Sequence, residues 1–401
     1  MGDFFPQAGL ARGDSLYKYY QVKKNFYASS SFLGPTCRDI PRNPDAVAGD
    51  SKWLGYVAVA NDEGKKELGR RDILIAFRGT QTAAEACVDA DTAMVSAAPI
   101  LGRANNPRCH SGFYKYYTTS DAQSKYNKTS CRDQILSSVR SLVNQYKNEQ
   151  LSITVAGHSL GAALALLCAT DLARNGYNKP QAAAEAEPDC TSPSGPSGPS
   201  SPSGPSGPSG PYGPTGASSN IPITAFPFAC PRLGDAGYGK VFDSLNPALR
   251  SLRITNKPDP VPRVPPAELG FVHVGPELLI DTSNSPYLKT TDPTSHLLEV
   301  YLHGLSSTQG TATANKRGRF EFVLKRDISL INKHSDALKD KYLVDPYWWT
   351  EKDKGMVQLV DGNWKLRDRE ADRHREDDED NDLDEDEDDE EDESVLIPSR
   401  L

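Results

Sequence analysis

The stretch SITVAGHSLGAALALLCATDLA, residues 152–173, constrains the fold of this chain more than any other part of the sequence. Its start alternates like a buried strand, with apolar side chains at Ile153 and Val155, and its end is an Ala/Leu run typical of a buried helix. Between them lies Gly157-His158-Ser159-Leu160-Gly161, a Gly-x-Ser-x-Gly pentapeptide. We therefore expect a sharp turn from strand to helix, with the serine at its apex.

Such a turn is the usual setting of a nucleophilic serine. The two glycines leave the space that side chains would otherwise fill, so Ser159 rises above the sheet with its hydroxyl free of the core. The following helix directs its N-terminus at the site, which favours negative charge there, and the Leu160 N–H can face a developing oxyanion. The alternative is a glycine-rich turn with a capping serine. The strand before the motif and the helix after it favour the nucleophile.

The remaining segments alternate between strand and helix patterns. Strands are predicted at 53–60 and 71–79, joined by a polar turn containing Gly64, and a helix is predicted at 133–147. Strand patterns then recur within 221–235 and 249–262. This order predicts an α/β fold with a largely parallel central sheet and helices on both faces. Ligands of such sheets meet the carboxyl ends of the strands.

Two segments depart from the globular pattern. A Pro/Gly/Ser-rich repeat predicts a surface loop at 190–219, and an acidic run predicts a disordered tail at 369–401. We expect residues 1–368 to form one domain that this loop interrupts. Eighteen acidic residues lie between Glu370 and Glu393. Without that run the formal charge changes from −9 to about +7, so the body can approach an anionic lipid surface.

The cysteines and the ends of the chain bear on compartment and cofactors. Seven cysteines, none in a C-x-x-C pair, argue against both a disulfide framework and zinc. We expect reduced thiols in a cytoplasmic protein, without signal peptide, transmembrane helix, metal, cofactor or nucleic-acid partner. The final Ser399-Arg400-Leu401 resembles a peroxisomal address and offers an alternative location.

A nucleophilic serine needs a histidine base and a carboxylate, which follow it in the chain order Ser, Asp or Glu, His. That order removes His110 and His158. His296 opens the apolar run of TSHLLEVYLHGL, whereas His303 sits inside that run, where a packed histidine is the simpler interpretation. Position favours His296 and leaves His303 open.

The carboxylate and the second oxyanion donor are sought in loops that follow strands. Asp259, in TNKPDPVPRVP, directly follows a strand and is stiffened by prolines on both sides. Asp235 and Asp281 are its rivals, and a turn or capping aspartate is the alternative for all three. Thr80 ends the strand LIAFRGT and offers a backbone N–H as a second oxyanion donor.

Several of these segments together resemble a known family. ILIAFRGT, ITVAGHSLGAALALL, FACPRLGD, NKPDPVP and HLLEVYLHGL, in this order, resemble the class 3 lipases. RDISLINKHSDALKDKYLVDPYWW and KGMVQLVDGNW resemble the plant phospholipases A1 of class II. The resemblance spans about residues 17–366, apart from the repeat, and implies an α/β-hydrolase fold. It also implies a nucleophile at Ser159, an acid at Asp259 and a base at His296.

The activity that this resemblance implies is metal-free hydrolysis of the sn-1 acyl ester of phospholipids in the cytosol. One departure is the segment EACVDAD, residues 85–91, where the family carries a tryptophan near the acyl pocket or lid. Two other functions compete with this one. The first is a lipase acting on neutral glycerides or galactolipids, and the second is a lipase-like protein that binds without turnover.

Overall fold

The structure is a computed structural model that describes residues 18–29, 31, 51–80, 89–181, 220–289, 294–307, 320–324, 326–349, 356–359 and 363–366. The predicted acidic tail, the whole of the predicted loop at 190–219, and most of the segment at 85–91 lie outside these residues. The division into one domain and a tail therefore stays a prediction.

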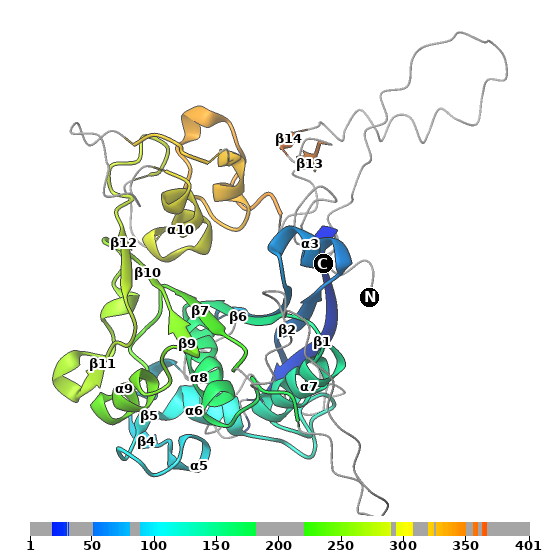
Figure 1. Ribbon diagram of the computed structural model, residues 1–401. Helices are drawn as coiled ribbons and strands as arrows, with labels where there is room; N and C mark the ends of the chain where they lie inside the picture. The colour runs from blue at the N-terminus through cyan, green and yellow to red at the C-terminus, as the bar shows by residue number, and fades with distance from the viewer. Residues whose placement is uncertain are drawn as a thin grey trace, which may run out of the picture.

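A central sheet of eight strands organises the fold (Figure 1), in the order β1-β2-β3-β6-β7-β10-β12, with β9 paired to β7. The pairs β1/β2 and β2/β3 are antiparallel, and all pairs from β3 onward are parallel. The strands are β1 Tyr20–Ala28, β2 Lys52–Ala60, β3 Arg71–Phe77, β6 Leu151–His158, β7 Ile223–Phe228, β9 Leu249–Ser251, β10 Arg253–Asn256 and β12 Glu277–Ile280. The predicted largely parallel sheet is confirmed.

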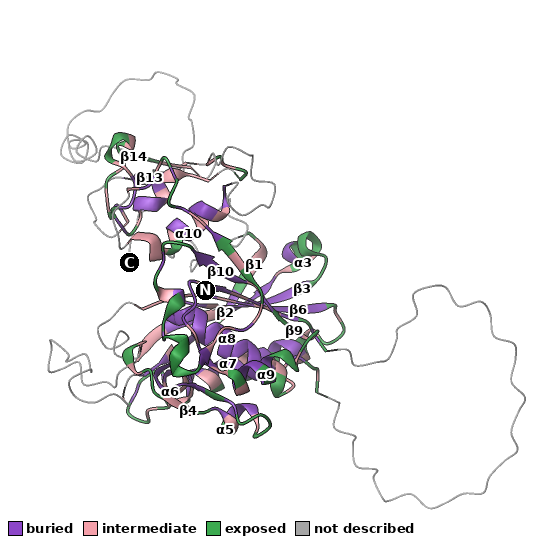
Figure 2. Ribbon diagram, turned by 90° about the vertical axis from the view of Figure 1, so that its left-hand side faces the viewer, coloured by how far each residue is buried: buried purple, intermediate pink, exposed green. Residues whose placement is uncertain are grey.

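Helices cover both faces of this sheet, as predicted. Figure 2 shows α6 (Ser111–Thr118), α7 (Cys131–Gln145) and α8 (Leu160–Arg174) on one face, and α10 (Leu298–Leu305) on the other, over β10. The main core lies on the α8 face, where every residue from Leu160 to Leu172 is buried. This packing fixes the position of the N-terminus of α8 at the carboxyl end of the central strand β6.

The predicted turn between β2 and β3 is wrong, because that segment forms the helix α3 (Asp62–Leu68). The Asn61 side chain caps it by accepting a 2.8 Å hydrogen bond from the Gly64 N–H, and Asp62 and Glu63 stand in its first turn. Gly64 is buried beneath Tyr19, where a Cβ would collide with the backbone. The glycine thus serves packing rather than a turn.

Smaller elements surround the central sheet. A four-stranded antiparallel sheet joins β11 (Phe271–Val272), β8 (Gly234–Asp235), β5 (Arg108–His110) and β4 (Met94–Ser96). Within the described residues, the remaining α-helices are α5 (Ala98–Leu101) and α9 (Ala236–Asp243), and β13 (Met356–Gln358) pairs with β14 (Trp364–Leu366). Among the described helices, none combines the length and the apolar character needed to cross a bilayer.

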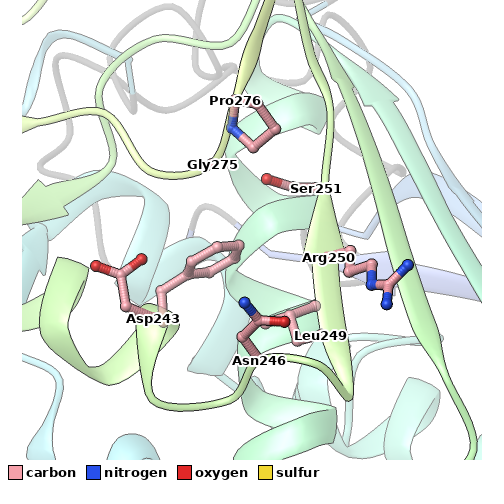
Figure 3. Close-up of a pocket in the computed structure, with 8 residues that line it drawn as sticks. Asp243, Asn246, Leu249, Arg250, Ser251, Gly275 and Pro276 are labelled. Carbon is pink, nitrogen blue, oxygen red and sulfur yellow. The ribbon is translucent and has the colours of Figure 1, made fainter.

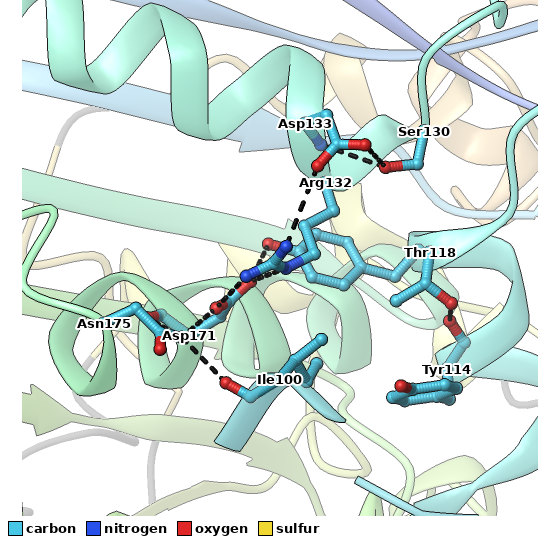
Figure 4. A network of polar contacts seen from close by, with 9 residues as sticks. Ile100, Tyr114, Thr118, Ser130, Arg132, Asp133, Asp171 and Asn175 are labelled. Atoms are coloured by element: carbon cyan, nitrogen blue, oxygen red, sulfur yellow. Dashed lines mark hydrogen bonds and ion pairs between the residues drawn. The ribbon is translucent and has the colours of Figure 1, made fainter. Parts of the chain in front are cut away.

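A buried ion pair joins the helices under the sheet (Figure 4). Asp171 of α8 is fully buried and accepts hydrogen bonds from Arg132 of α7 at 2.6 and 3.0 Å. The Tyr117 hydroxyl of α6 and the Asn175 amide donate to the same carboxylate, at 3.1 and 2.6 Å. Four donors therefore compensate the loss of water around one buried charge.

Candidate active site

The strand-to-helix junction has the strained geometry that the pentapeptide predicts. β6 ends at His158, α8 begins at Leu160, and Ser159 between them has φ 57° and ψ −124°. A Cβ on Gly157 would collide with the Gly161 carbonyl, and one on Gly161 with the Arg78 carbonyl. Both glycines are therefore required by the close approach of backbone to backbone, and the strain at Ser159 lifts its side chain out of the sheet.

Three predicted residues meet above the carboxyl ends of the strands. His296 Nε2 lies 2.8 Å from Ser159 Oγ, and His296 Nδ1 lies 2.8 Å from Asp259 Oδ2. Ser159 follows β6, Asp259 follows β10, and His296 ends the 3₁₀ helix η4 (Thr294–His296). The Asp259 side chain is fully buried, while that of His296 is 27% exposed and so open to a substrate.

The surroundings of Asp259 keep it ionised. Its Oδ2 accepts a 2.6 Å hydrogen bond from the Tyr301 hydroxyl, and its Oδ1 accepts a 2.9 Å hydrogen bond from the Val261 N–H. Burial by itself raises the pKa of Asp259. The hydrogen bonds and charge of His296, together with these two donors, outweigh burial and hold the pKa below its ordinary value.

The rivals of these residues have other roles. His303 is buried, and its Nε2 lies 2.8 Å from Ser285 Oγ, in keeping with a packed histidine. Asp235 caps α9 by accepting from the Tyr238 N–H, and Asp281 pairs with Lys257 at 3.0 Å. None of the three contacts Ser159 in the described residues, so the structure separates them from the predicted site.

The predicted oxyanion donors lie beside Ser159. Thr80 and Leu160 line the same cavity as Ser159 and His296. The Thr80 hydroxyl donates a 2.8 Å hydrogen bond to Asp89 Oδ2, so its proton points at that carboxylate. This leaves the backbone N–H of Thr80 as the group that can face an oxyanion, beside the N–H of Leu160 at the start of a 15-residue helix.

The cavity at this site has a volume of about 320 Å³. Its apolar wall, which suits an acyl chain, consists of Phe113, Leu160, Pro231, Val261, Val264 and Pro265. Its polar wall consists of Thr80, Asp89, Thr92, His110, Ser159 and His296. The cavity thus brings an apolar binding surface against the reactive groups.

A larger cavity, of about 620 Å³, lies elsewhere (Figure 3). It is lined by Phe242, Asp243, Asn246, Leu249, Arg250, Ser251, Gly275 and Pro276, none of which belongs to the site above. Its lining contains the Asp243 carboxylate and the Ser251 hydroxyl but no histidine, so it lacks the imidazole that activates Ser159.

Sequence reasoning missed several residues of the site. Tyr301 and Asp89 carry no local signal. His110 and His158 were excluded as the base, yet His110 lines the cavity and His158 Nε2 lies 2.7 Å from the His296 carbonyl oxygen. Their proximity to the site depends on the strand order of the sheet, so residue order gives no indication of it.

In the described part of the chain, no group of three or more His, Cys, Asp or Glu residues could hold a metal ion.

A largely parallel sheet with a strained serine after one strand, and a His–Asp pair supplied by later loops, defines the chain as an α/β-hydrolase with the site of a serine hydrolase. A family model described as Lipase (class 3) matches residues 74–197 and 214–269. Phospholipase A1-II 4 of Oryza sativa subsp. japonica is 42% identical over 358 residues, which cover 88% of this chain and 78% of the relative. Phospholipase A1-IIgamma of Arabidopsis thaliana is 40% identical over 374 residues, covering 92% and 80%. The chain belongs to the class 3 lipase family, among the plant phospholipases A1-II.

Two solved fungal lipases also share similarity with the chain. A fungal lipase–inhibitor complex is 23% identical with a TM-score of 0.39, covering 67% of this chain and 68% of that one. The triacylglyceride lipase of Rhizomucor miehei is 23% identical with a TM-score of 0.38 and the same coverage. Similarity at this level assigns no role to any residue of the site.

Proposed function

We propose that this protein is a phospholipase A1, a serine acylhydrolase that cleaves the sn-1 acyl ester of phospholipids at a membrane surface. The observation that carries the proposal is the position of His296, 2.8 Å from both Ser159 Oγ and Asp259 Oδ2. The names of the plant relatives support the substrate class. The net positive charge of the chain without its acidic run supports binding to an anionic surface.

In the acylation step, His296 Nε2 takes the proton of Ser159 as Oγ attacks the ester carbonyl carbon. The oxyanion is stabilised by the N–H groups of Thr80 and Leu160. When the bond between the acyl carbon and the glycerol oxygen breaks, His296 returns the proton to that oxygen of the departing lysophospholipid. The acyl group stays on Ser159.

In the deacylation step, His296 takes a proton from water as the water attacks the acyl-enzyme. The fatty acid leaves when the bond to Ser159 Oγ breaks and that oxygen regains its proton. Asp259 stays ionised throughout, because the hydrogen bonds that lower its pKa persist in each step. Asp259 accepts a hydrogen bond from the Nδ1–H of His296 and stabilises the imidazolium.

The substrate is tested with a phosphatidylcholine that carries different acyl chains at its two positions. Mass analysis of the released fatty acid and lysolipid should show loss of the sn-1 chain, and release of the sn-2 chain alone would contradict the proposal. Parallel incubations with a neutral glyceride and a galactolipid test the first alternative function. Preferred turnover of either lipid would identify it as the substrate.

The catalytic roles are tested with Ser159→Ala, which should fold normally, hydrolyse no ester and resist a fluorophosphonate probe. A fully active variant would refute the assignment of the nucleophile. If the wild-type protein binds phospholipid vesicles but neither turns over ester nor reacts with the probe, the protein is a binding protein. Turnover by the wild type that is lost in the variant excludes this second alternative function.

We further propose a cytoplasmic location, supported by the cysteine pattern, with a peroxisomal location as the alternative. Fluorescent fusions with and without residues 399–401 distinguish the two. Import that depends on Ser399-Arg400-Leu401 would support the peroxisome.

A further inference from the structure

The short turn that carries His296 has little internal structure of its own. η4 spans only Thr294–His296, and a single 3₁₀ turn has too few hydrogen bonds to hold a fixed orientation in isolation. The imidazole must nevertheless stay within hydrogen-bond distance of Ser159 and Asp259, which follow two different strands. Contacts from outside the turn therefore have to supply the precision.

Two consecutive carbonyl groups of this turn receive hydrogen bonds from side chains. His158 Nε2 lies 2.7 Å from the His296 oxygen, and Asn256 Nδ2 lies 3.0 Å from the Ser295 oxygen. His158 directly precedes Ser159, and Asn256 ends β10, three residues before Asp259. The turn that carries the base is thus held from the strand of the nucleophile and from the strand of the acid.

The hydrogen bond to the His296 carbonyl oxygen defines the tautomer of the His158 imidazole. A carbonyl oxygen only accepts, so Nε2 must carry the proton. Burial, and next the charge of His296, lower the pKa of His158 to about 4, which leaves the ring neutral at neutral pH. The two rings lie close, with centroids 4.7 Å apart. A neutral His158 adds no second positive charge when His296 takes up a proton.

Asn256 is itself held in one orientation. It is 2% exposed, its Nδ2 donates a second hydrogen bond to Thr282 Oγ1 at 2.9 Å, and its Oδ1 accepts from the Thr282 N–H at 3.2 Å. Its backbone N–H donates at 3.1 Å to the Tyr301 hydroxyl, which donates to Asp259. One buried residue therefore links the carboxylate and the turn of the base.

We propose that His158 and Asn256 are positioning residues that hold the His296 turn in register with Ser159 and Asp259 through the Ser295 and His296 carbonyl groups. Both residues act on the backbone of the turn rather than on the substrate, so neither is catalytic. In its kinetic consequences the inference rests on the hydrolytic function proposed above.

The first test compares two amides at position 158. His158→Gln can present an N–H near the position of Nε2, whereas the shorter amide of His158→Asn falls short of the carbonyl. With p-nitrophenyl butyrate, His158→Asn should lose about 10²-fold in kcat at nearly unchanged KM, because an ångström of misplacement has that effect. His158→Gln should recover most of the loss. Equal impairment of the two variants, or wild-type kcat in His158→Asn, would overturn the proposal.

A matched control separates positioning from general damage to a buried histidine. His303→Leu removes another buried imidazole and its Ser285 contact but leaves the His296 turn untouched. It should lower thermal stability and leave kcat unchanged. A loss of kcat in His303→Leu equal to that in His158→Asn would attribute both effects to the fold and contradict the proposal.

A second readout requires no turnover. The Nδ1 proton between His296 and Asp259 should give a low-field NMR resonance in the wild type and in His158→Gln. It should shift or broaden in His158→Asn and in Asn256→Leu. If the wild type hydrolyses no ester, the proposed function fails while the resonance still tests the positioning role. An unchanged resonance in both impaired variants would refute that role.

Discussion

Tyr301 donates a 2.6 Å hydrogen bond to Asp259 Oδ2, the same oxygen that lies 2.8 Å from His296 Nδ1. Burial, and next the hydrogen bond to Asp259, raise the pKa of Tyr301 far above its ordinary value, so the hydroxyl keeps its proton and always donates. The acid of the site is therefore held by a residue of α10, the helix that follows the turn of the base.

Tyr301→Phe removes this donor and leaves the shape of the core intact. A hydrogen bond to a charged group is worth about 1.5–3 kcal/mol, so we expect a loss of that order in the free energy of unfolding at pH 7. The folded-state pKa of Asp259 is depressed, so this stabilisation is present above the unfolded pKa of about 3.9 and is lost as pH falls through the folded value.

Chemical denaturation of the wild type and Tyr301→Phe at several pH values measures the difference. It should be largest near neutral pH and shrink below about pH 4. A difference that stays constant across this range would show that the lost hydrogen bond from the Asn256 N–H to the hydroxyl, rather than the carboxylate, is responsible.

Ser159→Gly should stabilise the protein while abolishing ester hydrolysis. Ser159 has φ 57°, a backbone conformation that costs a side-chain-bearing residue about 1–3 kcal/mol, and glycine adopts it readily. After glycine's greater flexibility in the unfolded chain is subtracted, we expect a gain of about 1 kcal/mol. Thermal unfolding measures it. Ser159→Ala retains the Cβ and should show no such gain, and equal stability of the two variants would argue against strain.

Gly157→Ala should prevent the elbow from closing. The added Cβ would collide with backbone atoms of Gly161 and Ala162, which have no flexible end to move aside. We expect a loss of several kcal/mol, or failure to fold, from the resulting overpacking. Gly239→Ala in α9 is the control, because its nearest neighbour is Val272 at 3.6 Å and alanine is the better helix former. Tolerance of both substitutions would contradict the steric argument.

Asp171→Ala should destabilise the protein without changing the kinetics of the site. It leaves the Arg132 guanidinium and the Tyr117 hydroxyl without their buried acceptor (Figure 4), a change that typically costs about 3–5 kcal/mol. Asp281→Ala breaks the exposed pair with Lys257 and should cost less than about 1 kcal/mol. Urea unfolding compares the two variants, and equal losses would remove the distinction between buried and exposed pairs.

The sequence by itself determined the local features of the protein. The spacing of Gly157, Ser159 and Gly161 between a strand and a helix pattern identifies the elbow. The sterics at Gly157 involve only Gly161 and Ala162 of the same turn, whereas Gly161 also approaches the Arg78 carbonyl of a distant segment. The alternation of strand and helix patterns along the chain likewise predicts the largely parallel sheet. The local reading failed at 61–70, where a seven-residue helix with a glycine inside it resembles a polar turn. The capping role of Asn61 was the signal that would have identified it.

Only the tertiary structure decided which distant groups meet Ser159. Chain order left His303 open beside His296, and Asp235 and Asp281 open beside Asp259, and the family resemblance chose among them without a physical reason. The reason is the strand order β6-β7-β10. Because β6 and β10 flank β7 and run parallel to it, the loops that follow them leave the sheet at the same edge. His158, Asn256 and Tyr301 reach the site in the same way, because contacts that span 39 to 138 residues depend on strand order and register, which no local pattern encodes.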